Sequence, residues 1–282
     1  MSLPGLDVPR LLRQYSLHPS KSLGQNFLVD EAALERIVEL AQISPGEVIL
    51  EIGAGLGSLT RHLAARARSV VAVELDAKLI APLEQVVLPY PNVQVVAGDI
   101  LALDPVELVL HQEYVVVANI PYYITSALIR HLLEARVTPE RLILTLQREV
   151  AKRICATPGE MSLLALSVQV YGHPEIVADI PAGAFYPPPK VDSAVIHIQL
   201  YPSPRIPRPE LDAFFQLIKA GFSQKRKTLR NSLSAGLRLP PSAAEAMLRK
   251  AAIDPMRRAE TLSIPEWHQL TPLYCAEFAA GK

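Results

Sequence analysis

The first half of the chain alternates short β-branched runs with segments of helical periodicity. The runs are VILEIG (48–53), VVAVELD (70–76), VQVVAGD (93–99) and YVVVANIPY (114–122). Helical patterns follow them at about 58–68, from 77 onward and up to 132. Because the runs lack an apolar and polar alternation, they are typical of strands buried on both faces. The pattern predicts an α/β fold with a doubly wound parallel sheet, which runs at 141–147 and 193–200 can extend.

Prolines mark the predicted domain boundary. Many of the 25 prolines cluster at 187–189 and in YPSPRIPRP (201–209), where neither a helix nor a central strand can continue. Beyond the second cluster, apolar residues fall at helical spacing from 211 to 233. The predicted parts are a sheet domain at 1–201, with an N-terminal extension at 1–20, a Pro-rich linker at 202–209 and a small all-helical domain at 210–282.

Charge is distributed unevenly along the chain, although 28 basic and 28 acidic residues balance overall. Residues 201–282 hold 13 basic and 7 acidic side chains, and residues 1–200 hold 15 and 21. This asymmetry predicts that the C-terminal part binds a polyanion, with solvated basic helix faces as the alternative.

Several classes of protein are disfavoured by the sequence. Its longest apolar runs fall short of the roughly 18 residues of a membrane span, and its first 21 residues lack the apolar core of a signal peptide. Cys155 and Cys275 lack the spacing of a zinc site and are expected to be ordinary thiols. We therefore expect a soluble, cytoplasmic protein without a metal, and a monomer.

A ligand site is predicted where three strands end. The first strand runs into a turn with Gly53 and Gly55, and glycines there let the backbone approach a ligand closely. Glu74 closes the second strand, where a carboxylate can accept both hydroxyls of a ribose. Asp99 and Ile100 follow the third strand and offer a carboxylate for an adenine amino group and an apolar side chain for its ring. Together these positions predict a bound adenosine.

Other interpretations of these residues exist. A GxGxG segment can be a plain tight turn, and an Asp after a strand is often a helix cap. A nicotinamide cofactor is disfavoured, because the third glycine of its fingerprint would fall at Ser58 and stands instead at Gly57. The adenosine could otherwise belong to NAD or to S-adenosylmethionine.

The tetrapeptide Asn119-Ile120-Pro121-Tyr122 ends the fourth strand. An exocyclic amine on a base is a poor nucleophile, because its lone pair is delocalised into the ring. The Asn119 Oδ1 atom and the carbonyl of Ile120 or Pro121 can accept its two N–H groups and aim the lone pair at a sulfonium methyl. Tyr122 can stack on the base. The alternative is a simple chain turn after a strand, which Asn and Pro often form.

The chain resembles the small-subunit ribosomal RNA adenine N6,N6-dimethyltransferases. The resemblance spans nearly the whole chain and includes the rare sequence segments PPPKVDS and RKTLRN. The matching segments are KSLGQNFL (21–28), EIGAGLGSLT (51–60), VELD (73–76), GDI (98–100), NIPY (119–122), AFYPPPKVDSAV (184–195), FSQKRKTLRNSL (222–233) and RAETLS (258–263). The chain departs from the family's usual residues at Met161-Ser162 and at Trp267.

The resemblance implies a Rossmann-like methyltransferase that dimethylates two adjacent adenines near the 3′ end of small-subunit rRNA, in a 30S or pre-30S particle. Its cofactor would be S-adenosylmethionine, and the implied contacts are Asn26, Leu28, Gly53, Glu74, Asp99 and Asn119. The target adenine would lie among Asn119, Pro121, Tyr122 and Phe185. Packing in the core is the alternative role for Phe185. Rival functions are a large-subunit rRNA dimethyltransferase, a nicotinamide dehydrogenase and a non-catalytic assembly factor.

A basic helix face is predicted in the C-terminal domain. On a continuous helix with 100° per residue, Lys219, Arg226 and Arg230 fall within about 40° of one another, beside the apolar stripe. We expect this face to lie along an RNA phosphate backbone. On the same projection Lys225 and Lys227 point elsewhere and are expected to be solubilising charges.

Overall fold

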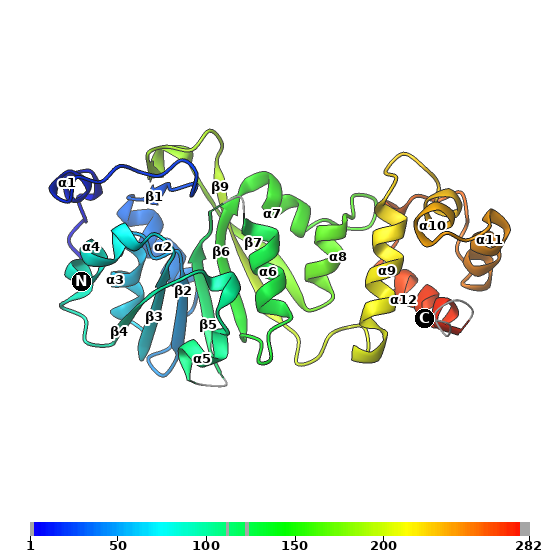
Figure 1. Ribbon diagram of the computed structural model, residues 1–282, viewed down its shortest axis with the longest axis horizontal. Helices are drawn as coiled ribbons and strands as arrows, with labels where there is room; N and C mark the ends of the chain where they lie inside the picture. Colours follow the sequence, from blue (N-terminus) through cyan, green and yellow to red (C-terminus); the bar gives the residue numbers. More distant parts are fainter. Residues whose placement is uncertain (1–2, 111–112, 122–123, 277–282) are drawn as a thin grey trace. The chain divides into compact units, whose positions relative to one another are not determined.

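The computed structural model describes residues 3–110, 113–121 and 124–276 (Figure 1). The described chain forms two compact units. The first runs to Ala151 and includes His173–Leu200, and the second comprises Lys152–Gly172 and the chain from Tyr201 onward.

The first unit is built on a seven-stranded sheet. Its first five strands in the sheet order run parallel, with β2 paired to both β3 and β5. The order is β4 (Val93–Ala97), β3 (Ser69–Glu74), β2 (Val48–Ile52), β5 (Val115–Asn119), β6 (Arg141–Gln147), β9 (Ser193–Leu200) and β7 (Gly172–Ile180).

The strand order creates a switch point between β2 and β5. The chain moves outward in one direction through β2, β3 and β4 and then in the other through β5 and β6. Because parallel crossovers are right-handed, the helices of these two halves cover opposite faces of the sheet. The chain therefore diverges at the carboxyl ends of β2 and β5, which is where open α/β sheets bind ligands.

Aspartates cap the N-termini of several helices of the first unit. The carboxylates of Asp30 and Asp76 accept N–H groups at the starts of their helices, as N-cap residues do. Apolar side chains of α2 and α3 pack with Ile49 and Val117 of the sheet. The helices are α1 (Val8–Gln14), α2 (Glu31–Leu40), α3 (Ser58–Ala64), α4 (Ala77–Val87), α5 (Pro105–Val109), α6 (Thr125–Leu133) and α7 (Arg148–Ile154), with short 3-10 turns η1 (Ile100–Ala102) and η3 (Ala182–Ala184).

The sheet differs from the expected parallel sheet of fully buried strands at both edges, in strand direction on the β9 side and in burial at β4. β9 runs antiparallel to β6, an arrangement that is common beside otherwise parallel strands. The side chains of β4 are partly exposed, since this strand lies at one edge. β7 was not predicted: its sequence contains Pro174 and half of its side chains reach solvent, as suits the other edge.

The N-terminal segment packs onto the first unit. Val8 and Leu12 of α1 form a small core with Phe27, Leu56 and Leu79. A two-residue strand, β1 (Phe27–Leu28), then pairs antiparallel with β8 (Phe185–Tyr186). The extension predicted at 1–20 is thus tied to residues near the ends of the strands.

The second unit is helical, and residues 152–172 belong to it. Met161, Leu166 and Val170 share a buried cluster with Phe214 and Leu217. The boundary predicted at 201 placed these residues in the sheet domain. The sequence of a helix that follows a strand does not show whether the helix packs on the sheet or on another part of the chain. The helices are α8 (Leu163–Gln169), α9 (Leu211–Phe222), α10 (Leu229–Leu237), α11 (Pro241–Lys250) and α12 (Ile264–Tyr274), with 3-10 turns η4 (Arg208–Glu210) and η5 (Ala259–Thr261).

The positions that depart from the family pattern have packing roles. Met161 is buried, and the Ser162 hydroxyl accepts the Ala165 N–H at the start of α8. Trp267 is fully buried beside Gly221, where an added Cβ would clash with the indole ring. The missing side chain at 221 therefore makes room for the larger ring. Within the described ranges, no helix has the length and apolarity that a membrane span requires.

Candidate active site

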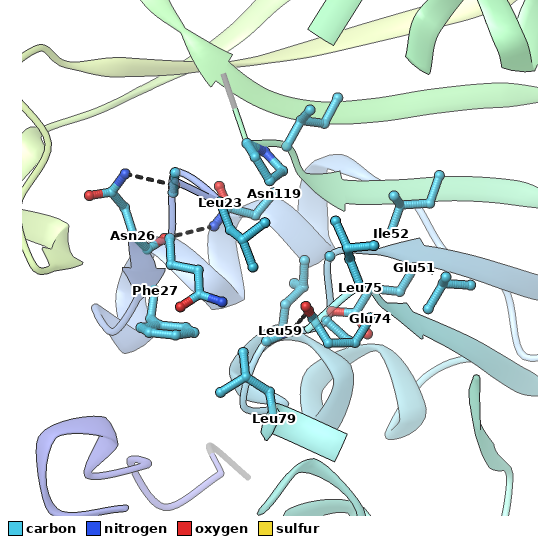
Figure 2. A pocket seen from close by; sticks show the side chains of 18 of the residues that line it. Leu23, Asn26, Phe27, Glu51, Ile52, Leu59, Glu74, Leu75, Leu79 and Asn119 are labelled. Atoms are coloured by element: carbon cyan, nitrogen blue, oxygen red, sulfur yellow. Dashed lines mark hydrogen bonds between the residues drawn. The ribbon is translucent and has the colours of Figure 1, made fainter. Parts of the chain in front are cut away.

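A pocket opens at the carboxyl ends of β2, β3 and β5 in the first unit (Figure 2). Its empty space is about 1030 Å³, including the part open to solvent. Ten of the residues predicted for the site line it: Asn26, Leu28, Gly53, Gly55, Glu74, Asp99, Ile100, Asn119, Pro121 and Phe185. Tyr122 lies outside the described residues.

The glycine turn after β2 needs the absence of a side chain. Gly55 has a φ of +60°, and a Cβ added there would lie 3.1 Å from the ring of Phe27. A positive φ and this close approach to the Phe27 ring would both strain a residue with a side chain. The turn thus brings the backbone to the pocket surface next to the N-terminal segment.

Glu74 is held rigidly at the end of β3. Its carboxylate is buried and accepts N–H groups from Gly55 to Oε2 and from Asp76 to Oε1, both at 2.8 Å. Burial raises the pKa of Glu74, and these two N–H groups oppose the rise. Because a carboxylate has about four acceptor positions, acceptor capacity remains for a ligand beyond these N–H groups. Glu74 can therefore present acceptors to a diol in a fixed orientation.

Asp99 and Ile100, which were predicted to contact an adenine, line the same pocket as Glu74. The Asp99 Oδ1 atom accepts the Leu101 N–H at 3.0 Å and so caps η1, which fits the alternative interpretation as well. Ile100 is buried, whereas Leu75, directly after Glu74, lines the pocket with 46% of its surface exposed. Sequence reasoning missed Leu75, although its place one residue beyond the predicted ribose acid was a usable signal.

Asn119 ends β5 at the switch point. Its Nδ2 donates to the backbone carbonyl of Asn26 at 3.3 Å, so the amide presents its acceptor, Oδ1, on the other side (Figure 2). The following turn is anchored as well, since the Ile120 N–H donates to the Thr145 carbonyl at 3.0 Å. The side chain predicted to accept a base amine is thus oriented by a residue 93 positions away.

Phe185 is both a core residue and a pocket residue. It is 4% exposed and packs with Ile180 and Ala184. β8 pairs it with Leu28, and both side chains line the pocket. The core alternative is therefore correct for most of its ring, and the stacking role stays a prediction for the part that lines the pocket.

Glu51 is a pocket residue that sequence reasoning passed over. It is 1% exposed, and its Oε2 atom has no hydrogen-bond partner among the described residues. Burial, with a smaller contribution from the charge of Glu74, raises the pKa of Glu51 to about 8. An acid inside a strand predicted to be buried on both faces was the signal in the sequence.

The basic residues of the second unit do not share one helix. α9 ends at Phe222 and α10 begins at Leu229, so Arg226 lies in the turn between them. At the start of α10, the N–H groups of Leu229 and Arg230 donate to the carbonyls of Arg257 and Pro255. These hydrogen bonds hold the first turn of a new helix. The projection that grouped Lys219, Arg226 and Arg230 on one face is therefore wrong, because it assumed an unbroken helix.

Comparisons with solved structures support the fold. The chain resembles the 23S rRNA methyltransferase ErmE, with a TM-score of 0.69 and 30% identity over 88% of this chain and 98% of that one. It also resembles a dimethyladenosine transferase from Plasmodium falciparum, with a TM-score of 0.77 and 26% identity over 89% and 98% of the two chains. The fold and the pocket therefore define a Rossmann-like methyltransferase.

Sequence comparisons define the family. The family model "Ribosomal RNA adenine dimethylase" matches residues 17–275. Relatives named ribosomal RNA small subunit methyltransferase A include a Dehalococcoides mccartyi (strain CBDB1) protein, 46% identical over 99% of this chain and 96% of its own. A Moorella thermoacetica relative of the same name is 42% identical over 93% of this chain and 94% of its own. The chain belongs to the ribosomal RNA adenine dimethylase family.

Proposed function

We propose that this protein uses S-adenosylmethionine to dimethylate N6 of two adjacent adenines near the 3′ end of small-subunit rRNA. The observation that carries the proposal is the Asn119 amide, whose donor end is fixed on Asn26 at the switch point of the sheet. We place the reaction in the cytoplasm, on a 30S or pre-30S particle, with the protein acting as a monomer.

The pocket residues fit S-adenosylmethionine. Glu74 offers acceptors for a ribose, and Asp99 lies beside the apolar side chains of Leu75 and Ile100, which suit an adenine. The Oε2 atom of Glu51 is buried in the pocket wall without a protein partner among the described residues, so it is available to hydrogen-bond a bound ligand. Asn26, Leu28, Gly53 and Asn119 complete the proposed contacts.

The cofactor supplies an electrophilic methyl group when it is bound, and the protein orients the nucleophile. Asn119 Oδ1 and a backbone carbonyl of the Ile120–Pro121 turn accept the two N–H groups of the adenine amine. The nitrogen lone pair is thereby directed into the pocket, which is catalysis by orientation. No strong base is required, because the ammonium formed by methyl transfer is acidic and releases its proton to water.

Aromatic stacking offsets the cost of extracting the adenine. Flipping a base from its stack costs a few kcal/mol, and a stacking contact contributes about 1–3 kcal/mol. We assign these contacts to Tyr122 and to the pocket-lining part of Phe185. Little energy then remains for selecting a sequence, so RNA shape and remote contacts must supply specificity.

We expect Glu74→Ala to weaken S-adenosylmethionine binding. The change removes a charge-assisted contact of about 1.5–3 kcal/mol, which corresponds to roughly 10- to 150-fold in Kd. Isothermal titration of the purified protein measures the effect, with circular dichroism to verify the fold. Glu84→Ala on the exposed surface of α4 is the matched control. An unchanged Kd in the Glu74 variant would refute the ribose assignment.

We assign remote RNA contacts to basic side chains of the second unit. Lys219 on α9 is exposed, as are Lys225, Arg226 and Lys227 in the turn that follows. Arg230 differs, because its guanidinium lies 3.3 Å from the carboxylate of Glu245. Arg230 is therefore partly neutralised, and the turn is the stronger candidate for phosphate contacts.

Arg226→Glu is expected to weaken RNA binding and to flatten its salt dependence. Removing one phosphate contact lowers the slope of log K against log salt by about 0.7–0.9. Filter binding to small-subunit particles at several salt concentrations measures the slope. Arg66→Glu makes the same charge change on an exposed residue of the first unit, just after α3. If both variants keep the original slope, Arg226 does not contact RNA.

Methyl transfer to purified particles tests the reaction itself. Labelled methyl should pass to small-subunit particles that lack the modification, and nucleoside analysis should detect N6,N6-dimethyladenosine. The likeness to ErmE, named as a 23S rRNA methyltransferase, makes large-subunit rRNA the second candidate substrate. Primer extension on both rRNAs separates the two, and a stop in the large-subunit rRNA alone would overturn the proposed substrate.

A further inference from the structure

Residues 20–28, which we call the strap, form one wall of the pocket. Residues 23–28 line it, and Figure 2 shows Leu23, Asn26 and Phe27 on one side with Glu51, Ile52 and Leu75 on the other. Most of the strap has no regular secondary structure: β1 begins at Phe27. Only Phe27 and Leu28 of the strap are buried, so residues 20–26 are held mainly by hydrogen bonds. Segments held in this way open at a low free-energy cost.

Two neighbouring strap residues are bonded to the ends of different strands. The Gln25 Nε2 atom donates to Asp76 Oδ2 at 2.8 Å, just beyond the end of β3. The carbonyl of Asn26 accepts the Asn119 amide at the end of β5. The strap thus bridges the β3 and β5 sides of the pocket.

Both the oxygen and the nitrogen of the Gln25 side-chain amide form hydrogen bonds. Its Oε1 atom accepts the Ser20 N–H at 2.7 Å, while its Nε2 atom reaches Asp76, 51 residues away. Asp76 in turn donates its N–H to Glu74 Oε1 and accepts the Lys78 N–H with Oδ1. A chain of hydrogen bonds therefore runs from the base of the strap to the carboxylate assigned to the ribose.

We propose that the Gln25–Asp76 hydrogen bond is a latch, and that Gln25 is a positioning residue that holds the strap closed over the cofactor. The proposal rests on the proposed function for the identity of the bound molecule, but the latch itself is a property of the free protein. Opening this bond releases the strap from the β3 side of the pocket, so that it can swing on its remaining bond to Asn119 and let the cofactor or its product leave. The charge on Asp76 makes this hydrogen bond stronger than one between neutral groups.

Two substitutions can break and restore the latch while keeping the hydrogen bonds to Ser20 and Lys78. Gln25→Glu keeps the acceptor for the Ser20 N–H but removes the donor and sets two carboxylates together. Asp76→Asn keeps an acceptor for the Lys78 N–H, and Asn is as good an N-cap as Asp. Combined, the two changes rebuild the bond with reversed polarity, since the amide introduced at position 76 would donate to the carboxylate introduced at position 25.

Amide hydrogen exchange of the ligand-free protein is the first measurement. In Gln25→Glu the strap amides should exchange 3- to 30-fold faster than in the wild type, and in the double variant they should return toward the wild-type rate. Gln85→Glu, on the exposed surface of α4, is the matched control and should leave these rates unchanged.

Binding of S-adenosylhomocysteine is the second measurement. Gln25→Glu should raise its Kd and its dissociation rate 3- to 30-fold, and the double variant should recover most of the loss. Wild-type values in Gln25→Glu, or a defect that Asp76→Asn does not rescue, would overturn the latch. The exchange measurement needs no ligand, so it decides the latch even if the wild type failed to bind S-adenosylhomocysteine, a result that would count against the proposed function.

Discussion

Asn119→Ala is expected to lower the rate of methyl transfer at least 100-fold while the protein still folds and binds RNA. The alanine removes the acceptor that directs the adenine amine and leaves the Asn26 carbonyl without its side-chain donor. Loss of one preorganised hydrogen-bonding group at a reacting centre typically costs two to three orders of magnitude in rate. Single-turnover assays with saturating cofactor and small-subunit particles measure the chemical step.

Gln199→Ala is the control for this prediction. Gln199 is an exposed amide on β9, and its Nε2 donates to the Glu140 carbonyl, away from the pocket. Its turnover should match the wild type. Asn119→Ala with near-normal single-turnover rates would remove the amide from the mechanism and leave the backbone carbonyls of the turn as the acceptors.

Glu51→Gln is expected to make the protein more stable at alkaline pH than the wild type. Burial raises the pKa of Glu51 from 4.5 to about 8. Between these pH values the folded protein holds a proton that the unfolded chain has released, so the free energy of unfolding falls as pH rises and levels off above about 8. At about 1.4 kcal/mol per pKa unit, the contribution amounts to several kcal/mol. Glutamine is neutral at every pH, so the variant does not lose this stability as the pH rises.

Guanidinium unfolding followed by circular dichroism at pH 5.5 and 8.5 measures this effect. The stability difference between Glu51→Gln and the wild type should grow by about 2–4 kcal/mol from the lower to the higher pH. Glu84→Gln on the exposed surface of α4 is the control, and its difference should be the same at both values. An equal difference for Glu51→Gln at both pH values would show that the carboxyl is already charged at pH 5.5.

Local patterns predicted the elements of the sheet well. The runs at 141–147 and 193–200 coincide with β6 and β9, and the first four runs overlap β2 to β5 to within one residue at their starts. Uninterrupted β-branched runs identify these strands because they are packed on both sides. β7 escaped prediction for the opposite reason: an edge strand tolerates Pro174 and exposed polar residues, so its sequence resembles a loop.

The part of the candidate site that lies at or just after strand ends was predicted from the sequence. Gly53, Glu74, Asp99 and Asn119 all line one pocket, because the carboxyl ends of parallel strands meet at one edge of the sheet. The basic face of the second unit was predicted wrongly, since periodicity cannot show that α9 stops at Phe222. The start of the next helix depends on carbonyls of the 255–257 loop, which are distant in sequence.

The order of the strands along the chain, the acids and glycines at their ends and the family of the motifs can all be read from the amino-acid sequence. Three-dimensional packing sets which residues meet: Gln25 with Asp76, Asn119 with the Asn26 carbonyl, and residues 152–172 with the second unit. The reason is physical. Side-chain spacing along a segment sets its local conformation, whereas hydrogen bonds over 51 or 93 residues exist once packing has brought the segments together.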